Sequence, residues 1–327
     1  MPRRRRDRSP SPKLLTAKLT NADNTAQLVD LYQRFGRSME PIHLATLWVG
    51  LGKCLAQQRD VPAPATSTLA AGSGAGAPPP PADDGDGDGD GSAPSSSSEA
   101  GSRRRRRRAA PRSEQEVERE RERMLASLSK RTIELLPQFQ EQAVANTCHA
   151  LGKMRRYDTP LFEALAARAA RSAPKFTEQG LGNVLYSLGL LSEHGLTHPA
   201  AATSLMDSAV SRLLADRACL TEQGLSMIIY AWGLMAPRGL THPEGCRVFL
   251  EAAAERRAEH THQGLTNIMY GAGLLASAGV VAPAAFDELL LEASERLDAE
   301  VFDSQHIANV MHAIGLMAQH GGKRGSA

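Results

Sequence analysis

Apolar residues recur at helical spacing in one segment, and the chain repeats this segment several times. The copy at Gln179–Leu191 reads QGLGNVLYSLGLL, with apolar residues two, five, six, nine and twelve positions after the glutamine. Such spacing marks one buried face of an α-helix. Related segments begin at Gln142, Gln223, Gln263 and Gln305, so the glutamines lie 37, 44, 40 and 42 residues apart. A motif that recurs at this interval predicts a solenoid.

Local signals predict where the helices of each repeat begin. A good N-cap residue stands two positions before four of the glutamines, namely Thr177, Thr221, Thr261 and Asp303. A second helix is expected between copies, opened by a proline in its first turn, at Pro160, Pro199, Pro243 and Pro283. The predicted fold class is therefore all-α, an α-solenoid of helix–turn–helix repeats of about 40 residues.

Each repeated segment also carries a late glycine, which makes a helix less stable by about 1 kcal/mol relative to alanine. These glycines are Gly152, Gly189, Gly233, Gly273 and Gly315. The cost is tolerable if another helix packs closely against that position. The glycines therefore predict tight contacts between helices.

Composition divides the chain of 327 residues into four regions. Residues 1–12 are predicted to be a disordered basic tail, and residues 13–60 a degenerate helical repeat, in which His43–Leu55 matches the repeated helix. Residues 61–112 are Ala/Pro/Gly/Ser-rich with a DDGDGDGDG run, which predicts a disordered low-complexity linker that interrupts the solenoid. Residues 113–320 are predicted to form the main α-helical repeat array.

The other side of the repeated helix carries amides and rings at the glutamine and at four and seven positions after it, which places them on one face. The row comprises Gln142, Asn146 and His149; Gln179, Asn183 and Tyr186; Gln223, Met227 and Tyr230; Gln263, Asn267 and Tyr270; Gln305, Asn309 and His312. Along a concave surface these side chains could bond to and stack on successive bases of single-stranded RNA. Alternatively they hold neighbouring repeats together, which their near-identity favours because base-reading positions should vary. Solvent-facing asparagines would support the first interpretation, and asparagines bonded to the adjacent repeat the second.

Basic charge lies outside the repeats. The net charge is +6 over residues 1–60, zero over 61–130 and −4 over 131–327. Nonspecific RNA binding needs a basic footprint, so the acidic repeat body favours a protein–protein scaffold that makes no RNA contact. Arginine runs in the tail and linker could be nuclear import signals or RNA-tethering arms, and the first could belong to a transit peptide. The linker run comprises Arg103, Arg104, Arg105, Arg106, Arg107 and Arg108.

Nothing in the sequence is typical of an enzyme, a metal site or a cofactor site. The cysteines form no CxxC pair and are expected to be reduced thiols. His198 and His242 each precede a helix-opening proline, as turn residues would. No Ser–His–Asp or paired-carboxylate arrangement stands out, and no apolar run is long enough to span a membrane. We expect no catalytic activity, no cofactor and no metal.

The last repeated helix is expected to end near Met317, with GGKRGSA after it. We expect no partner helix after it, so cover by such a helix should be missing at Ile307, Val310 and Ile314. Solenoids, in contrast, normally end in a polar capping repeat. The sequence predicts either a truncated gene model or a docking surface for a protein partner on this uncapped helix.

With helix pairs of about 40 residues and the pattern QGLxNxxYxxGLL, the chain resembles the octotricopeptide-type and related helical repeats of organelle RNA proteins, which include FAST-kinase-like proteins and subunits of RNA-editing substrate-binding complexes. The resemblance covers residues 139–319 well and 14–56 weakly. The PPPEW-like signature and the C-terminal RAP-type domain of such proteins are absent. The resemblance implies a noncatalytic scaffold that binds single-stranded RNA in processing, editing, stability or translation, in a mitochondrion or plastid. The tail RRRRDRSPSP also fits a nuclear protein.

Overall fold

The computed structural model describes residues 10–57, 114–298 and 302–320, and every regular element in these ranges is helical. The predicted all-α class is therefore confirmed. The α-helices are α1 (Pro12–Thr20), α2 (Thr25–Phe35), α3 (Pro41–Gln57), α4 (Glu114–Leu135), α5 (Glu141–Met154), α6 (Thr159–Ser172), α7 (Glu178–Ser192), α8 (Pro199–Ala215), α9 (Glu222–Met235), α10 (Pro243–Glu255), α11 (His262–Ser277), α12 (Pro283–Asp298) and α13 (Ser304–His320).

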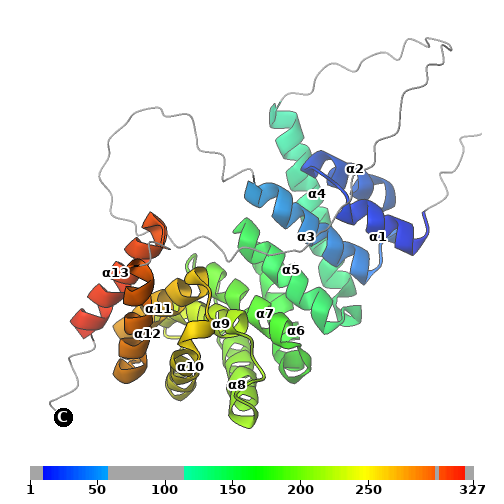
Figure 1. The fold of residues 1–327 in the computed structure, drawn as a ribbon. Coiled ribbons are helices and arrows are strands. Elements are labelled where there is room, and N and C mark those ends of the chain that lie inside the picture. The colour runs from blue at the N-terminus through cyan, green and yellow to red at the C-terminus, as the bar shows by residue number, and fades with distance from the viewer. Residues whose placement is uncertain (1–9, 58–113, 299–301, 321–327) are drawn as a thin grey trace, which may run out of the picture.

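The helices form two layers of a curved array (Figure 1). The repeated helices pack side by side in the order α3, α5, α7, α9, α11 and α13. The second helices pack beside one another in the order α2, α4, α6, α8, α10 and α12. Each repeat contacts mainly its neighbours, and stacking them builds one continuous core, which confirms the predicted solenoid.

Prolines open the second-layer helices, as the sequence predicts. Pro199, Pro243 and Pro283 are the first residues of α8, α10 and α12, and Pro160 is the second residue of α6. Proline has no backbone N–H and a fixed φ near −65°, so it loses no helical hydrogen bond at these positions.

Small residues allow neighbouring repeated helices to approach closely. A Cβ built on Gly233 would lie 2.6 Å from Gly271 Cα, and one built on Gly273 would lie 2.9 Å from Ala313 Cα. The late glycine of one copy thus meets the residue eight positions after the glutamine of the next copy. The corresponding contacts are made by Gly52, Gly152 and Gly189. Close packing therefore explains why the chain repeats a residue that weakens a helix.

Helix α1 covers the side of α3 that faces away from the array. A Cβ built on Gly50 would lie 3.7 Å from the Leu19 backbone oxygen, and His43 Nε2 lies 3.0 Å from the Pro12 oxygen. Gly50 stands two residues before the late glycine Gly52, the position that contacts the preceding repeated helix elsewhere. Helix α1 therefore occupies the place of a preceding repeat.

Burial differs among the three α13 residues that the sequence predicts to lack a partner helix of their own repeat. Val310 is buried because α13 packs on α11, and Ile314 is partly buried. The exposed apolar side chains on α13 are Ile307, at 40% exposure, and Met311, at 61%. The open face of this helix therefore runs through Ile307 and Met311.

Candidate functional site

Side-chain caps fix where four of the repeated helices begin, namely α7, α9, α11 and α13. The hydroxyls of Thr177, Thr221 and Thr261 accept hydrogen bonds from the backbone N–H three residues later, at 3.1, 3.1 and 3.0 Å. The Asp303 carboxylate accepts from the His306 N–H at 2.8 Å. These bonds confirm the four predicted N-caps and hold the glutamines of these four copies in the first helical turn.

The predicted amide row divides into an exposed and a buried part. The glutamines lie at the edge of the repeated-helix layer, with Gln142, Gln179, Gln223 and Gln305 exposed and Gln263 half-buried. The asparagines are buried, with exposures of 8, 1 and 4% for Asn183, Asn267 and Asn309. Asn146 is half-buried and Met227 is buried. An RNA base can therefore reach the glutamines, but not the buried asparagines unless the repeats separate.

Two glutamine–asparagine pairs bond within their own helix rather than between repeats. Gln263 Nε2 donates to Asn267 Oδ1 at 3.1 Å, and Gln305 Nε2 donates to Asn309 Oδ1 at 3.0 Å. Glutamine four residues before asparagine is a favourable helical pairing. Asn267 and Asn309 thus bond within their own helices. They match neither arrangement that the sequence left open, which were solvent-facing asparagines and asparagines bonded to the adjacent repeat.

The ring row forms a ladder that crosses five repeated helices. Its members in order are His149, Tyr186, Tyr230, Tyr270 and His312, with ring centroids 6.1, 5.9, 6.0 and 5.5 Å apart. The three tyrosines are buried, His149 is half-buried and His312 is exposed. Aromatic pairs at such distances each stabilise a fold by roughly 0.5–1.5 kcal/mol beyond their burial. Each tyrosine has ring neighbours on both sides, so a base cannot stack on it while the ladder is intact.

Burial raises the pKa of Tyr186, Tyr230 and Tyr270 above the ordinary tyrosine value. Glu193 adds to this rise in pKa at all three rings through its negative charge. The Tyr230 hydroxyl is buried with no hydrogen-bond partner among the described residues. The tyrosines therefore stay neutral near pH 7 and contribute packing rather than acid–base chemistry.

Arginines of the second layer clamp the turn of the preceding repeat, a feature that the sequence analysis missed. Arg168 Nη2 donates to the Phe139 oxygen at 2.9 Å, and Arg212 Nη2 donates to the Phe176 oxygen at 2.6 Å. Both arginines stand nine residues before an N-cap position. Arg256 and Arg296 reach back in the same way, to the oxygens of Leu220 and His260. Register against the caps could have revealed Arg168 and Arg212, but not Arg256 and Arg296, which stand five and seven residues before the next N-cap.

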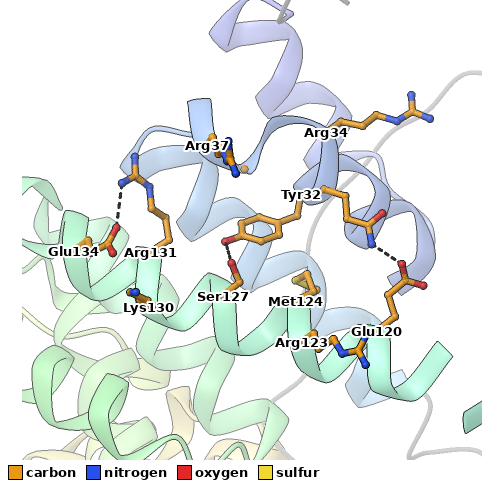
Figure 2. A pocket seen from close by; sticks show the side chains of 12 residues that line it. Tyr32, Arg34, Arg37, Glu120, Arg123, Met124, Ser127, Lys130, Arg131 and Glu134 are labelled. Atoms are coloured by element: carbon orange, nitrogen blue, oxygen red, sulfur yellow. Dashed lines mark hydrogen bonds and ion pairs between the residues drawn. The ribbon is translucent and has the colours of Figure 1, made fainter. Parts of the chain in front are cut away.

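Arg131 holds the same register in α4 but makes no such clamp. Its Nη1 lies 3.2 Å from Glu134 Oε2 instead, and its Nε is buried with no hydrogen-bond partner among the described residues. Its side chain lines a groove of about 720 Å³ between α2 and α4 (Figure 2). We call this the α2–α4 groove and define it by Tyr32, Arg37, Arg123, Lys130 and Arg131.

The α2–α4 groove is basic. Its lining holds five Lys or Arg side chains and two Glu side chains. Arg37, Arg123 and Lys130 are exposed, and none of them has a carboxylate within ion-pair distance in the part of the chain that the structure describes. Such side chains are free to meet a ligand's negative charge.

An aromatic side chain crosses the same groove. The Tyr32 hydroxyl lies 3.1 Å from Ser127 Oγ, and the ring remains half-buried (Figure 2). Gln33 Nε2 donates to Glu120 Oε1 at 2.6 Å, which ties α2 to α4. The groove thus combines a fixed ring with cations that meet no carboxylate in the described part of the chain.

Charge is unevenly distributed along the array. Residues 10–57 and 114–177, which carry α1 to α6, hold 16 Lys/Arg and 12 Asp/Glu, a balance of +4. Residues 178–298 and 302–320, which carry α7 to α13, hold 7 and 15, a balance of −8. A polyanion is therefore attracted to the N-terminal part of the array and repelled by the C-terminal part.

The histidines of the GLTHP segments are turn residues, as predicted. His198 Nδ1 accepts from the Ala201 N–H at 3.1 Å, and His242 Nδ1 accepts from the Gly245 N–H at 2.9 Å. Each therefore caps a second-layer helix. In the described ranges no three His, Cys, Asp or Glu side chains cluster closely enough to hold a metal ion.

The cysteines are unpaired in the structure. Burial raises the pKa of Cys148 and of Cys246 to about 12, so both thiols are protonated at neutral pH. Protonated thiols are poor nucleophiles. These two cysteines therefore act as small core residues.

Several predictions fall on residues outside the described ranges. They are the arginine run Arg103–Arg108, the linker 61–112 and most of the tail 1–12. Among the helices that are described, none is long and apolar enough to cross a bilayer. Compared with protein-family models and with curated proteins, the chain matches none of them.

Proposed function

We propose that the protein is a helical-repeat scaffold that binds single-stranded RNA through the phosphate backbone at the α2–α4 groove. The observation that carries this proposal is a set of three exposed cations, Arg37, Arg123 and Lys130, which lie beside the Tyr32 ring and have no carboxylate partner among the described residues. Guanidinium groups bind phosphate through paired hydrogen bonds. A ring beside cations is the combination that single-stranded nucleic acids favour.

Recognition in this proposal is electrostatic and tolerant of sequence. The buried tyrosines of the ladder keep the repeats together, and the exposed glutamines remain available for secondary contacts. No bond is made or broken, so the protein acts by holding RNA for processing, editing, stabilisation or translation by other factors. Binding through phosphates must weaken steeply as the salt concentration rises.

The test is fluorescence anisotropy of a labelled pool of single-stranded RNA with the full chain across a salt series. In the test variant, Arg37, Arg123 and Lys130 are all changed to Ala. We expect affinity to fall and the slope of log K against log salt to become shallower by about 2, because each lost phosphate contact removes about 0.7 from the slope.

The matched control removes the same charge from the acidic part of the array by changing Arg217, Arg247 and Arg257 to Ala. These arginines pair with Glu255, Glu244 and Glu288. Their loss should change RNA affinity little, because exposed charges act over only about 8–10 Å at physiological salt. Equal losses in both triple variants, or a loss only when Arg103–Arg108 are replaced by serine, would refute the groove as the binding site.

A protein–protein scaffold with no RNA contact is the second candidate function. The observation that favours it is the exposed apolar face of α13 at Ile307 and Met311, which is typical of a protein-binding surface. Absence of RNA binding by the full chain at low salt would support this candidate over the first.

We place the protein in a mitochondrion or plastid on the family resemblance alone, with the nucleus as the alternative. The basic tail is compatible with either destination. Microscopy of the full chain fused at its C-terminus to a fluorescent protein separates them. Nuclear fluorescence would contradict the organelle assignment.

A further inference from the structure

A pocket of about 380 Å³ lies among four neighbouring repeated helices, α3, α5, α7 and α9. Side chains at the glutamine, asparagine and ring positions of these helices line it, together with two lysines. Its volume is at the small end of the range for small-molecule sites, about 300–1,000 Å³, so the pocket suits one small ligand. We call this the α3–α9 pocket and define it by Lys53, Asn146, His149, Lys153, Gln179 and Gln223.

The two lysines are specific to this part of the array. Lys53 and Lys153 directly follow the late glycines of α3 and α5, whereas the four later copies carry leucine at this position. Lys53 is exposed and Lys153 is half-buried, and neither has a carboxylate within ion-pair distance among the described residues. Two ammonium groups that line one pocket without a counter-charge attract an anion.

The lining also contains a carboxylate, but hydrogen bonds to α9 engage it. Glu178 Oε1 accepts from the Thr221 backbone N–H at 2.7 Å and from the Thr221 hydroxyl at 2.6 Å. Two lysines stand against this one glutamate in the lining, which leaves a balance of +1 when histidine is counted as neutral. The pocket therefore stays positive beside the acidic part of the array.

Amide side chains in the pocket have unused hydrogen-bonding groups. The side chains of Asn146, Gln179 and Gln223 make no hydrogen bond to any residue that the structure describes. In α11 and α13, by contrast, the glutamine bonds to the asparagine of its own helix. An amide both donates and accepts, so it matches the mixed donors and acceptors on the edge of a base.

The ring ladder ends at this pocket. Its first ring, His149, is half-buried and lines the pocket. The ring position of α3 holds Val49, which also lines the pocket, so the ladder does not continue into α3. The pocket thus presents an imidazole and an aliphatic side chain to a ligand, whereas the ladder tyrosines are buried.

We propose that the α3–α9 pocket binds one nucleotide. Its phosphate lies at Lys53 and Lys153, its base packs beside His149 and Val49, and the amides bond the edge of the base. A ligand with a phosphate, a ring and polar edges uses all of these groups, whereas an acidic peptide would use the lysines alone. None of these residues lines the α2–α4 groove, so the inference does not rest on RNA binding there. The nucleotide is either free or part of an RNA strand, since both present the same chemistry.

The test is isothermal titration calorimetry of the full chain with adenosine 5′-monophosphate at low salt, with adenosine as the comparison. We expect the monophosphate to bind at least about 10-fold more tightly, because only its phosphate meets the two ammonium groups. Changing Lys53 and Lys153 together to Ala should abolish this difference. The comparison of the two ligands uses the wild type alone, so it does not depend on the folding of a variant.

The matched control changes Lys13 and Lys18 to Ala, which removes two exposed lysines from α1. This variant should bind the monophosphate like the wild type, and so should the triple variant of the α2–α4 groove. The labelled RNA pool then identifies the source of the nucleotide. Weaker RNA binding by the Lys53 and Lys153 double variant indicates a nucleotide within RNA, and unchanged RNA binding indicates a free nucleotide.

Three results would overturn the pocket. They are no binding of the monophosphate to the wild type at millimolar concentration, equal affinity for adenosine and the monophosphate, and loss of binding in the groove triple variant rather than in the lysine double variant. A short all-glutamate peptide that binds as tightly as the monophosphate would also overturn it, by assigning the pocket to an acidic peptide. Monophosphate binding without any RNA binding would contradict only the proposed RNA function.

Discussion

The substitution Gly233→Ala measures how closely neighbouring repeated helices pack. The added methyl group would lie 2.6 Å from Gly271 Cα and 2.8 Å from Gly271 O, both of them main-chain atoms of α11. Carbon atoms in contact are about 3.5–4.0 Å apart, so α11 must move by roughly 1 Å. Alanine gains about 1 kcal/mol in helix propensity, whereas overpacking a core costs about 1–3 kcal/mol. Because main chain cannot rotate away, we expect the upper end of that cost and a net loss of about 2 kcal/mol in the free energy of unfolding.

Gly182→Ala is the matched control for this prediction. Its added methyl group would lie 3.3 Å from Met227 Sδ, the flexible part of a side chain that can shift. We therefore expect Gly182→Ala to raise stability by up to about 1 kcal/mol. Urea unfolding of both variants, followed by circular dichroism, gives the comparison. A rise of the unfolding midpoint in Gly233→Ala, like the rise expected for Gly182→Ala, would refute close main-chain packing at Gly233.

Three further predictions test other parts of the array. Tyr230→Phe removes a buried hydroxyl that has no partner among the described residues and should raise the free energy of unfolding by about 1 kcal/mol, measured in urea. Burial lowers the pKa of His260. The stability that the neutral, buried imidazole contributes is complete above the unfolded pKa of about 6.5 and is lost as the pH falls below it. His260→Phe should therefore reduce the fall in melting temperature between neutral and acidic pH. Arg212→Ala removes the hydrogen bond to the Phe176 oxygen and should lower the free energy of unfolding by about 2–3 kcal/mol. Arg212→Lys should restore little of this stability, because lysine lacks the planar fork. Equal stability of wild type and Arg212→Ala would contradict the clamp.

Local signals in the sequence predicted the fold because each repeat contains the residues that determine where its helices begin. Thr221 is an N-cap and Pro199 opens a helix for reasons that depend only on a few neighbouring residues. Repetition then predicted the solenoid, since identical units with one apolar stripe must cover each other. The short helix α1 was not singled out, because its role depends on contact with Gly50 in α3 rather than on a repeated motif.

Whether the amide and ring side chains of the repeated helices are buried could not be predicted from one helix alone. Tyr186 and Asn183 lie on the polar face of the repeated helix, and only the distance between helices decides whether that face reaches water. Contacts such as Gly233 against Gly271 bring the helices close enough to bury the tyrosine ladder. A glycine lowers helix propensity locally, but it also permits a short distance between repeats, and that distance cannot be obtained from the sequence.

The basic groove could not be predicted from the sequence either, because its residues lie far apart along the chain. Arg37 lies before the linker and Arg123 after it, and only the packing of α2 on α4 unites them. The regional charge sum concealed this cluster, because the glutamates of α4 cancel its arginines when residues are counted along the chain. In the structure, exposed cations without a carboxylate partner in the described ranges gather on one side of that helix.

The most direct measurement of the central claim is a map of ultraviolet cross-links between the full chain and single-stranded RNA, read by mass spectrometry. We expect cross-links at the α2–α4 groove, at Tyr32 and the segments around Arg37 and Lys130, and none at Tyr186, Tyr230 or Tyr270. Cross-links on the ladder tyrosines would contradict the conclusion that these rings hold the repeats together rather than read bases. Absence of any cross-link under low-salt conditions would contradict the RNA-binding function itself.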